Sequence, residues 1–187
     1  MINPSNIVSE TRRPVDDTQM RLIDAIHNRW RFDATLRPTY PADLLESYGP
    51  LADAIQAGDT DTISQPLHWV GINHYFDIIV RKLDDGEATD RMLAYPTVTE
   101  AGEAETHTDM GWPITPGGFT ELLVRLRNDY PNLPPIYITE NGCAYDDPIV
   151  DGRCADSRRI DHLDQHLRAI RHPSTPASTF AAASSGR

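Results

Sequence analysis

The chain has 187 residues, 39% of them hydrophobic, and a formal net charge of −11 at pH 7. This length allows one domain with a real core but is short for a complete α/β barrel, which needs about 200 residues or more. The chain has no cluster of Lys and Arg for binding nucleic acids or anionic membranes, and no apolar stretch reaches the roughly 18 residues of a membrane span. The first residues lack the basic region and the apolar run of a signal peptide, so we expect a cytoplasmic protein.

The first third of the chain predicts helices. Apolar side chains recur at helical spacing over residues 16–30, which predicts an amphipathic helix. Pro41 and Pro50 can each begin a short helix, because the first helical position needs no N–H donor. Gly58 is expected to end the second of these.

Two strand-like apolar runs follow at residues 67–73 and 75–80. Residues 84–110 are polar and show no periodicity, which predicts a long surface loop. A helix is expected over residues 119–130, because its apolar side chains line one face, and a strand is expected at residues 136–140.

The last predicted helix carries an apolar stripe at Ile160, Leu163, Leu167 and Ile170. The alternation of strand and helix indicates βαβ units and a parallel sheet, and so an α/β fold. From Pro173 onward the composition is that of a disordered tail. We therefore expect one domain over residues 1–172 and a tail over residues 173–187.

Glu140 is the first candidate for chemistry. It ends a β-branched apolar run and precedes Asn141-Gly142, a pair that starts a turn. Glu140 should therefore lie at the carboxyl end of a parallel strand, where α/β proteins build their active sites. As a nucleophile or base it would need a second carboxylic acid as partner. The alternative is a rim carboxylate that caps the following turn.

Asn73 and Tyr75 end the other clear strand. The alternation of side chains along a strand places these two on the same side, with His74 facing away. Together they could hold a hydroxylated ligand or orient a carboxylate. The alternative is that both satisfy local backbone groups.

His162 and His166 are spaced i, i+4 on the last helix, as metal ligands can be. The glutamate of the His-Glu-x-x-His motif and a third ligand are both missing. We therefore expect histidines at the boundary of the apolar stripe, and no metal site.

Other polar and aromatic residues are expected to be structural. Trp112 is interpreted as a packing residue rather than a sugar platform, and Asp146 and Asp147 as solvated turn charges. Cys143 and Cys154 are the only cysteines, and we expect both to be unpaired thiols.

The run Ile136–Gly142 closely resembles the nucleophile motif of glycoside hydrolase family 1, the β-glucosidases and their relatives. Cys143 departs from the motif, which usually has an aliphatic residue or arginine there. The similarity covers roughly residues 2–171. Its other segments are His27–Trp30 with Tyr40–Asp43, Gln65–Tyr75, Gly111–Gly118, Asp151–Arg153, Arg159-Ile160 and His166-Leu167.

This resemblance implies a partial (β/α)8 TIM barrel, roughly its fifth to seventh β/α units, and a retaining β-glycosidase that needs no cofactor or metal. Glu140 matches the catalytic nucleophile of the family, which forms a glycosyl-enzyme that water then hydrolyses. Tyr75 matches the tyrosine that hydrogen-bonds this carboxylate, and Asn73 matches a polar residue of the same substrate pocket. The chain should begin inside the fifth strand, at Met1–Pro4.

The family's general acid/base is a glutamate in an Asn-Glu-Pro motif, which this sequence does not contain. Counterparts of the first four strands and of the eighth strand are also missing. We therefore expect a truncated fragment with negligible activity by itself. The alternatives are a non-catalytic fragment, a half-enzyme that docks onto a separately encoded N-terminal half, and a binder of hydroxylated ligands.

The tail suggests a frameshift hypothesis. One choice of codons for residues 173–187, read one base earlier, gives Ala-Ile-Asp-Ala-Gly-Val-Asp-Val-Arg-Gly-Arg-Phe-Val-Trp-Ser. This product resembles the family's approach to its eighth strand. Sequencing the gene tests the hypothesis, which fails if no other frame encodes Phe-Val-Trp-Ser.

Overall fold

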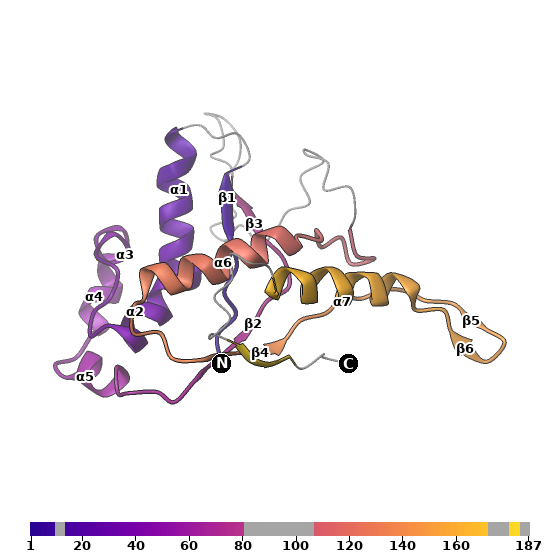
Figure 1. Ribbon diagram of the computed structural model, residues 1–187. Coiled ribbons are helices and arrows are strands. Elements are labelled where there is room, and N and C mark those ends of the chain that lie inside the picture. Colours follow the sequence, from indigo (N-terminus) through magenta and orange to yellow (C-terminus); the bar gives the residue numbers. More distant parts are fainter. Residues whose placement is uncertain (10–13, 81–106, 172–179, 184–187) are drawn as a thin grey trace.

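The computed structural model describes residues 1–9, 14–80, 107–171 and 180–183. Its central sheet is parallel (Figure 1) and has the strand order β2 (Val70–Asn73), β4 (Ile136–Glu140), β7 (Phe180–Ala183). Ile2 adds a parallel bridge to Ile72 on the other edge of β2. The parallel α/β sheet expected from the sequence is therefore confirmed.

A second parallel pair lies beyond the carboxyl end of β2. Strand β1 (Ile7–Ser9) pairs with β3 (Ile78–Val80), so that Ile7 lies opposite Ile78. The sequence predicted a strand over residues 75–80, but only its last three residues pair. It did not predict β1, because a strand of three residues is too short to show a periodicity.

Helix α6 (Pro116–Asp129) covers one face of the central sheet. Their shared core contains Phe119, Leu122, Leu123 and Leu126 from the helix and Val70, Ile72, Ile136 and Ile138 from the strands. The apolar helical face predicted over residues 119–130 is therefore confirmed. Because strand side chains alternate, Gly71, Tyr137 and Thr139 face the opposite side of the sheet.

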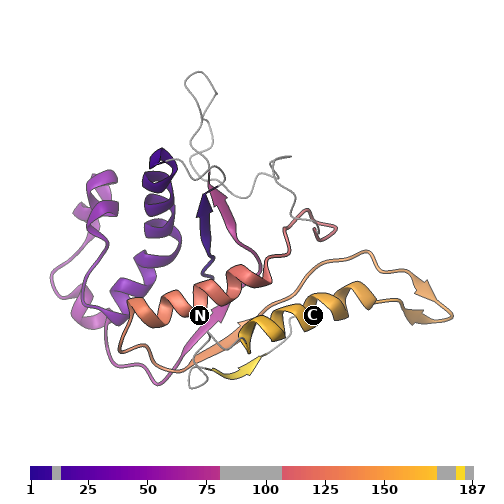
Figure 2. The same cartoon turned by 45° about the horizontal axis from the view of Figure 1, so that its top comes forward.

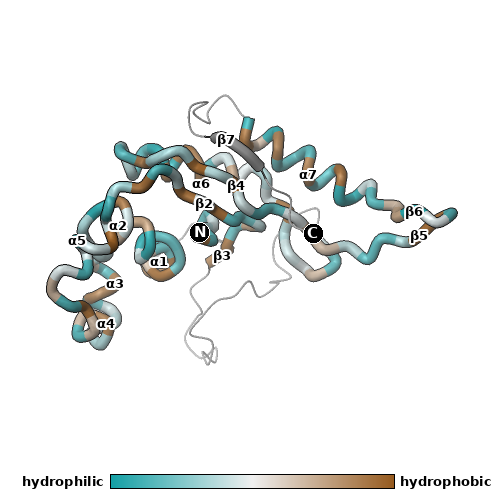
Figure 3. Tube along the Cα trace, turned by 90° about the horizontal axis from the view of Figure 1, so that it is seen from below, coloured by the Kyte–Doolittle hydropathy of each residue, from teal (hydrophilic) through white to brown (hydrophobic). Residues whose placement is uncertain are grey.

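Helix α7 (Ser157–Ile170) runs beside α6 in both ribbon views (Figures 1 and 2). Figure 3 shows the apolar positions that recur along it. Much of the predicted apolar stripe is open to solvent, with exposed fractions of 59% for Ile160, 37% for Leu163 and 40% for Leu167. His162 and His166 are instead buried, at 3% and 1% exposure. The interpretation of these histidines as boundary residues was therefore wrong.

The N-terminal third is helical, as predicted, with elements α1 (Pro14–Asp24), the π-helical segment η1 (Ala25–Arg29), α2 (Trp30–Leu36), α3 (Ala42–Ser47), α4 (Gly49–Ala54) and α5 (Asp59–Ile63). The helix predicted over residues 16–30 thus continues beyond that range. Gly58 has a φ of 89° and precedes α5, whereas α4 already ends at Ala54. The role predicted for Gly58 as the end of the preceding helix was therefore wrong.

A short hairpin extends from the body of the molecule after the Glu140 strand (Figure 2). Strands β5 (Ile149–Val150) and β6 (Arg153–Cys154) pair in antiparallel fashion. Asp151 and Gly152 join them with positive φ angles of 50° and 74°, which suit a two-residue hairpin turn.

Two predicted irregular segments are described only in part. Most of the loop expected over residues 84–110 lies outside the described residues, and so does most of the tail expected over residues 173–187. Within that tail, however, Phe180–Ala183 form β7 and pair with β4. An unpaired strand edge favours such pairing. In the described parts of the chain, no helix is both long and apolar enough to span a membrane.

Candidate active site

The carboxyl ends of β2 and β4 bring Asn73 and Glu140 together. The two residues are partners in the strand register, after an irregularity between Ile72 and Asn73. The His74 N–H donates to the Glu140 carbonyl oxygen at 3.0 Å, which continues the pairing past the end of β2. The predicted position of Glu140, at the carboxyl end of a parallel strand, is therefore the position that it has in the structure.

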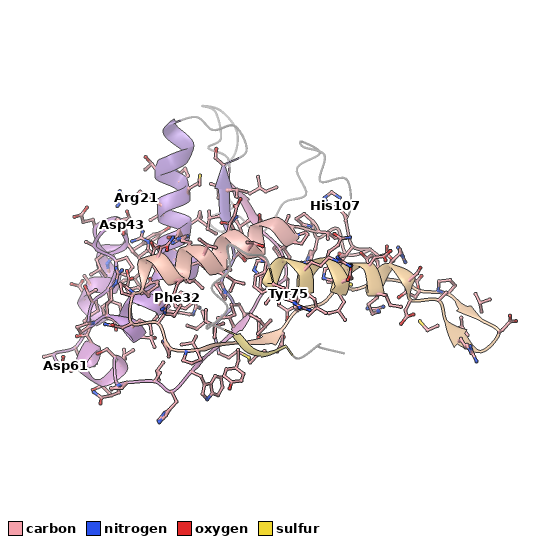
Figure 4. The ribbon with its side chains drawn as sticks, in the orientation of Figure 1. Arg21, Phe32, Asp43, Asp61, Tyr75 and His107 are labelled. Atoms are coloured by element: carbon pink, nitrogen blue, oxygen red, sulfur yellow. The ribbon has the colours of Figure 1, made fainter. Side chains whose placement is uncertain are left out.

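Tyr75 contacts the Glu140 carboxylate directly. Its hydroxyl group donates a hydrogen bond to Glu140 Oε2, and Tyr75 lies two residues beyond the end of β2 (Figure 4). Burial and the neighbouring Glu140 carboxylate raise the pKa of Tyr75 to about 12. The phenol therefore keeps its proton near neutral pH and remains a donor to Glu140.

Asn73 is buried beside the same carboxylate strand. Thr139 Oγ1 lies 2.6 Å from Asn73 Oδ1 and 3.0 Å from the Ile72 carbonyl oxygen, and it can donate its single hydrogen to either. The Asn73 side chain is thus held through its oxygen. Its Nδ2 group makes no hydrogen bond to the other described residues and can donate to a ligand.

The turn after Glu140 is held by the side-chain amide of Asn141 and by a segment distant in sequence, near Asp109. Asn141 is buried, and its Nδ2 donates to the His74 carbonyl oxygen at 2.9 Å. The Asp109 N–H donates to the Ala144 carbonyl oxygen at 3.1 Å. The chain near residue 109 is therefore tied to the loop that follows the Glu140 strand.

Two arginines at the start of α7 hold this loop from its other side. Arg159 donates to the Cys143 carbonyl oxygen at 2.6 Å and to Asp147 at 2.7 Å. Arg158 donates to Asp109 at 2.8 and 3.0 Å. The Asp147 side chain is only 2% exposed, so its interpretation as a solvated turn charge was wrong. Sequence reasoning missed this cluster because its members are far apart in the chain.

The remaining candidates have structural contacts. Trp112 packs against the rings of Tyr75 and Phe76, with centroid distances of 5.6 and 4.9 Å, as its interpretation as a packing residue requires. Cys143 and Cys154 are both free thiols, as predicted. Among the residues that the structure describes, no group of three or more His, Cys, Asp or Glu side chains could hold a metal ion.

Comparison with known proteins identifies relatives over nearly the whole chain. The family model described as glycosyl hydrolase family 1 matches residues 3–177. A bifunctional β-D-glucosidase/β-D-fucosidase from Bifidobacterium breve is 33% identical over an alignment of 174 residues, and the match covers 83% of this chain and 36% of that protein. A 6-phospho-β-galactosidase from Clostridium acetobutylicum is 30% identical over an alignment of 177 residues, and the match covers 83% of this chain and 37% of that protein.

Solved structures give the same result for the fold. The crystal structure of a psychrophilic β-glucosidase from Micrococcus antarcticus superimposes with a TM-score of 0.83 at 34% identity. The superposition covers 98% of this chain but only 42% of that structure. The chain therefore has the fold of a part of such a glycosidase barrel, and it spans well under half the length of the relatives that it matches.

Proposed function

Because the chain belongs to glycosyl hydrolase family 1, we propose that it is the part of a retaining β-glycosidase that carries the catalytic nucleophile, Glu140. The observation that supports this most directly is the hydrogen bond from the Tyr75 hydroxyl to Glu140 Oε2 at the rim of a parallel sheet. The phenol holds one carboxylate oxygen and leaves the other free to attack.

In the proposed reaction Glu140 attacks the anomeric carbon of a β-glycoside. A bond forms between the carboxylate oxygen and this carbon, and the bond to the leaving-group oxygen breaks. Water then hydrolyses the glycosyl-enzyme ester and restores the carboxylate. Tyr75 positions Glu140 through their hydrogen bond, and Asn73 Nδ2 donates to a hydroxyl group of the sugar.

In this proposal the chain supplies only part of the barrel. We assign residues 1–172 to the fifth to seventh β/α units of the barrel, with Ile2 in the fifth strand, β2 as the sixth and β4 as the seventh. The general acid/base of the fourth strand is then missing, in agreement with the absence of an Asn-Glu-Pro motif. Losing proton transfer to the leaving group costs about 10²–10⁴-fold in rate, so we propose negligible turnover by the isolated chain.

A chimera tests the role of Glu140. Residues 3–171 of this chain replace the matched segment of the Bifidobacterium breve relative, and hydrolysis of an aryl β-glucoside is measured. Glu140→Gln should lower kcat/KM by roughly 10³-fold or more, while the exposed control Glu46→Gln should leave it unchanged. Comparable activity of the chimera with and without Glu140 would contradict the role of Glu140 as nucleophile. Turnover by the isolated chain that Glu140→Gln abolishes would contradict the proposed lack of activity of that chain.

A second candidate function is that of a half-enzyme that docks onto a separate N-terminal half. It is favoured by the apolar side chains that the structure leaves open: Trp69 is 53% exposed beside β2, and the α7 stripe of Ile160, Leu163 and Leu167 is exposed as well. A soluble monomer rarely leaves so many large apolar groups uncovered.

Mixing experiments test this alternative. The part of the Bifidobacterium breve relative that precedes its matched segment is added to this chain, and complex formation is followed by sedimentation. A one-to-one complex that Leu163→Lys weakens at least tenfold would support a half-enzyme. The exposed polar variant Asp164→Lys on the same helix is the matched control. Absence of a complex at micromolar concentrations would exclude this alternative.

A further inference from the structure

Three buried histidines connect the end of β2 with helix α7. His74 is fully buried, and His162 and His166 are 3% and 1% exposed. His74 follows the last residue of β2, and the other two lie on successive turns of α7. Phe119 of α6 lies between the two groups. The proposed reaction uses none of these rings.

The four rings form a continuous column. His74 stacks on Phe119 with a centroid distance of 4.3 Å and an interplanar angle of 12°. Phe119 contacts His166 at 6.3 Å, and His166 stacks on His162 at 4.1 Å and 25°. This column joins the residue that follows β2 to helix α6 and helix α7, so its packing contributes to the docking of α7.

The hydrogen bonds of the column define neutral histidines. His74 Nδ1 lies 3.2 Å from the Pro4 carbonyl oxygen, and His166 Nδ1 lies 2.8 Å from the His162 carbonyl oxygen. Because a carbonyl oxygen only accepts, each Nδ1 carries the hydrogen of the neutral ring. Nε2 of both rings and both nitrogens of His162 have no partner among the described residues. A second proton on any of these rings would therefore lack an acceptor.

The charges that act on the column also oppose protonation. His162 faces Arg159 one turn earlier on α7, and His166 faces His162 on this helix and His74 across from β2. The α6 neighbour is the uncharged ring of Phe119, and the N-terminal segment contributes only the Pro4 carbonyl group. Burial lowers the pKa of His74 and His162 to about 4 and also lowers the pKa of His166.

We propose that His74, His162 and His166 form an acid-released latch, in which α7 stays docked on α6 only while all three rings are neutral. Release of α7 would also displace Arg158 and Arg159, which hold the loop after Glu140. The latch thus couples pH to the order of the segment next to the candidate nucleophile. It does not depend on the catalytic role of Glu140.

Proton linkage fixes the direction and the size of the effect. A free histidine has a pKa of about 6.5, so in mild acid the released state binds protons that the docked state excludes. As the pH falls below about 6.5, each histidine lowers the docking equilibrium constant by up to about tenfold per pH unit, and for His74 and His162 this continues towards pH 4. Three histidines together give up to about a thousandfold per unit. Above pH 7.5 docking should not depend on pH.

Hydrogen exchange at single amides tests the latch in the full chain. Protection factors of the α7 amides, corrected for intrinsic exchange, are measured from pH 8 to pH 5. We expect the protection factors of the α7 amides to fall steeply below pH 6.5. Those of the α2 amides should fall by the same amount only at lower pH. His162→Phe keeps a ring in the column and removes no hydrogen bond of the original side chain, and it should reduce the steepness by up to about tenfold per pH unit. The exposed control His68→Phe should leave it unchanged.

Several results would overturn the latch. One is protection of the α7 amides that does not depend on pH. Another is an equal and simultaneous loss of protection in α2, which would indicate global acid unfolding. A third is the same pH slope in His162→Phe as in the original chain. A second measurement does not rely on a variant. Nuclear magnetic resonance titration of the histidine rings should show no protonation of the three buried rings in the docked state above pH 5. A buried ring that titrates near pH 6.5 while α7 stays docked would also overturn it.

Discussion

Asp77 is a buried carboxyl group whose environment favours its neutral form. It is 7% exposed and lies over Gly118, where a β-carbon would come within 2.0 Å of its carboxyl oxygens. Burial raises the pKa of Asp77 to about 7, and the charge of Glu121 adds to the increase. The hydrogen bonds with Asn6 and Thr115 lower the pKa but do not offset this increase. Gly118 therefore provides the space in which Asp77 is held.

The raised pKa gives a pH-dependent stability with a definite sign. The unfolded carboxyl ionises near 3.8 and the folded one near 7, so the stabilisation from Asp77 is complete below pH 3.8 and is lost as the pH rises to 7. Asp77→Asn should remove this loss. Relative to the original chain, the variant should gain up to about 4 kcal/mol of unfolding free energy between pH 4 and pH 7.

Urea unfolding at a series of pH values measures this difference. The exposed control Asp53→Asn should show no such gain. A constant difference between the Asp77→Asn variant and the original chain across this range would mean that Asp77 ionises normally. Gly118→Ala should destabilise the chain at every pH, because the new methyl group meets the Asp77 carboxyl group.

The sequence allowed the positions of the site residues to be predicted, but not the burial of Asp77. Glu140, Tyr75 and Asn73 could be predicted because they lie at or just beyond the ends of strands whose apolar patterns are clear, and the structure brings them together. The burial of Asp77 could not be predicted. It depends on Gly118, a residue of a different element, and no local sequence pattern indicates their contact.

At the scale of elements, a buried ion cluster joins α6 to the N-terminal helices. Asp24 accepts two hydrogen bonds from Arg125 at 2.8 and 2.6 Å, one from Arg29 at 2.9 Å and one from Asn28 at 2.7 Å. Although burial opposes ionisation, these partners keep the pKa of Asp24 below its ordinary value. Arg29 also pairs with Asp43, which lies beside Arg21 in Figure 4.

Arg125→Met should therefore destabilise the chain by about 2–3 kcal/mol, because it leaves the Asp24 carboxylate buried with one cationic partner fewer. Thermal and urea unfolding at pH 7 measure the loss. Arg168→Met on α7 is the matched control, since its pair with Asp164 is exposed, and it should cause no measurable change. Equal effects of the two substitutions would contradict the structural role of the cluster.

The orientation of α7 shows where periodicity fails as a guide. The pattern of Ile160, Leu163 and Leu167 correctly predicted a helix, but not which face is buried. An apolar stripe indicates that a partner is expected on that side and does not indicate that this chain supplies it. In the described residues α7 packs on α6 through His162 and His166 instead, because α6 offers the ring of Phe119.

At the scale of the whole molecule, the sheet is a part of a barrel whose face opposite α6 is open. The chain spans 36% of the Bifidobacterium breve relative, 37% of the Clostridium acetobutylicum relative and 42% of the glycosidase structure. The sheet face opposite α6 carries Trp69 and Tyr137, which contact each other at 5.4 Å, and Gly71 leaves room for the Trp69 ring. The sequence could predict this partial barrel through the family resemblance, whereas its strand alternation predicted only a parallel sheet.

The end of the chain provides the sharpest test at this scale, because composition and structure give different expectations for Phe180–Ala183. A disordered tail would add nothing to stability, but β7 pairs in parallel with β4, the strand that carries Glu140. A chain that ends at residue 171 should lose about 1–3 kcal/mol of unfolding free energy, since several backbone hydrogen bonds along β4 are removed. Exchange of the Ile138 amide should accelerate as well, because the N–H of Ile138 faces β7.

A chain that ends at Ala183 is the matched control for this truncation, because it keeps β7 complete. It should have the unfolding free energy and the β4 exchange rates of the full chain. If both truncations behave alike, β7 does not contribute to stability, and composition is the better guide to the tail. If only the shorter chain loses stability, the segment expected to be disordered closes the edge of the strand that ends at Glu140, because a parallel sheet accepts any backbone that can extend beside it.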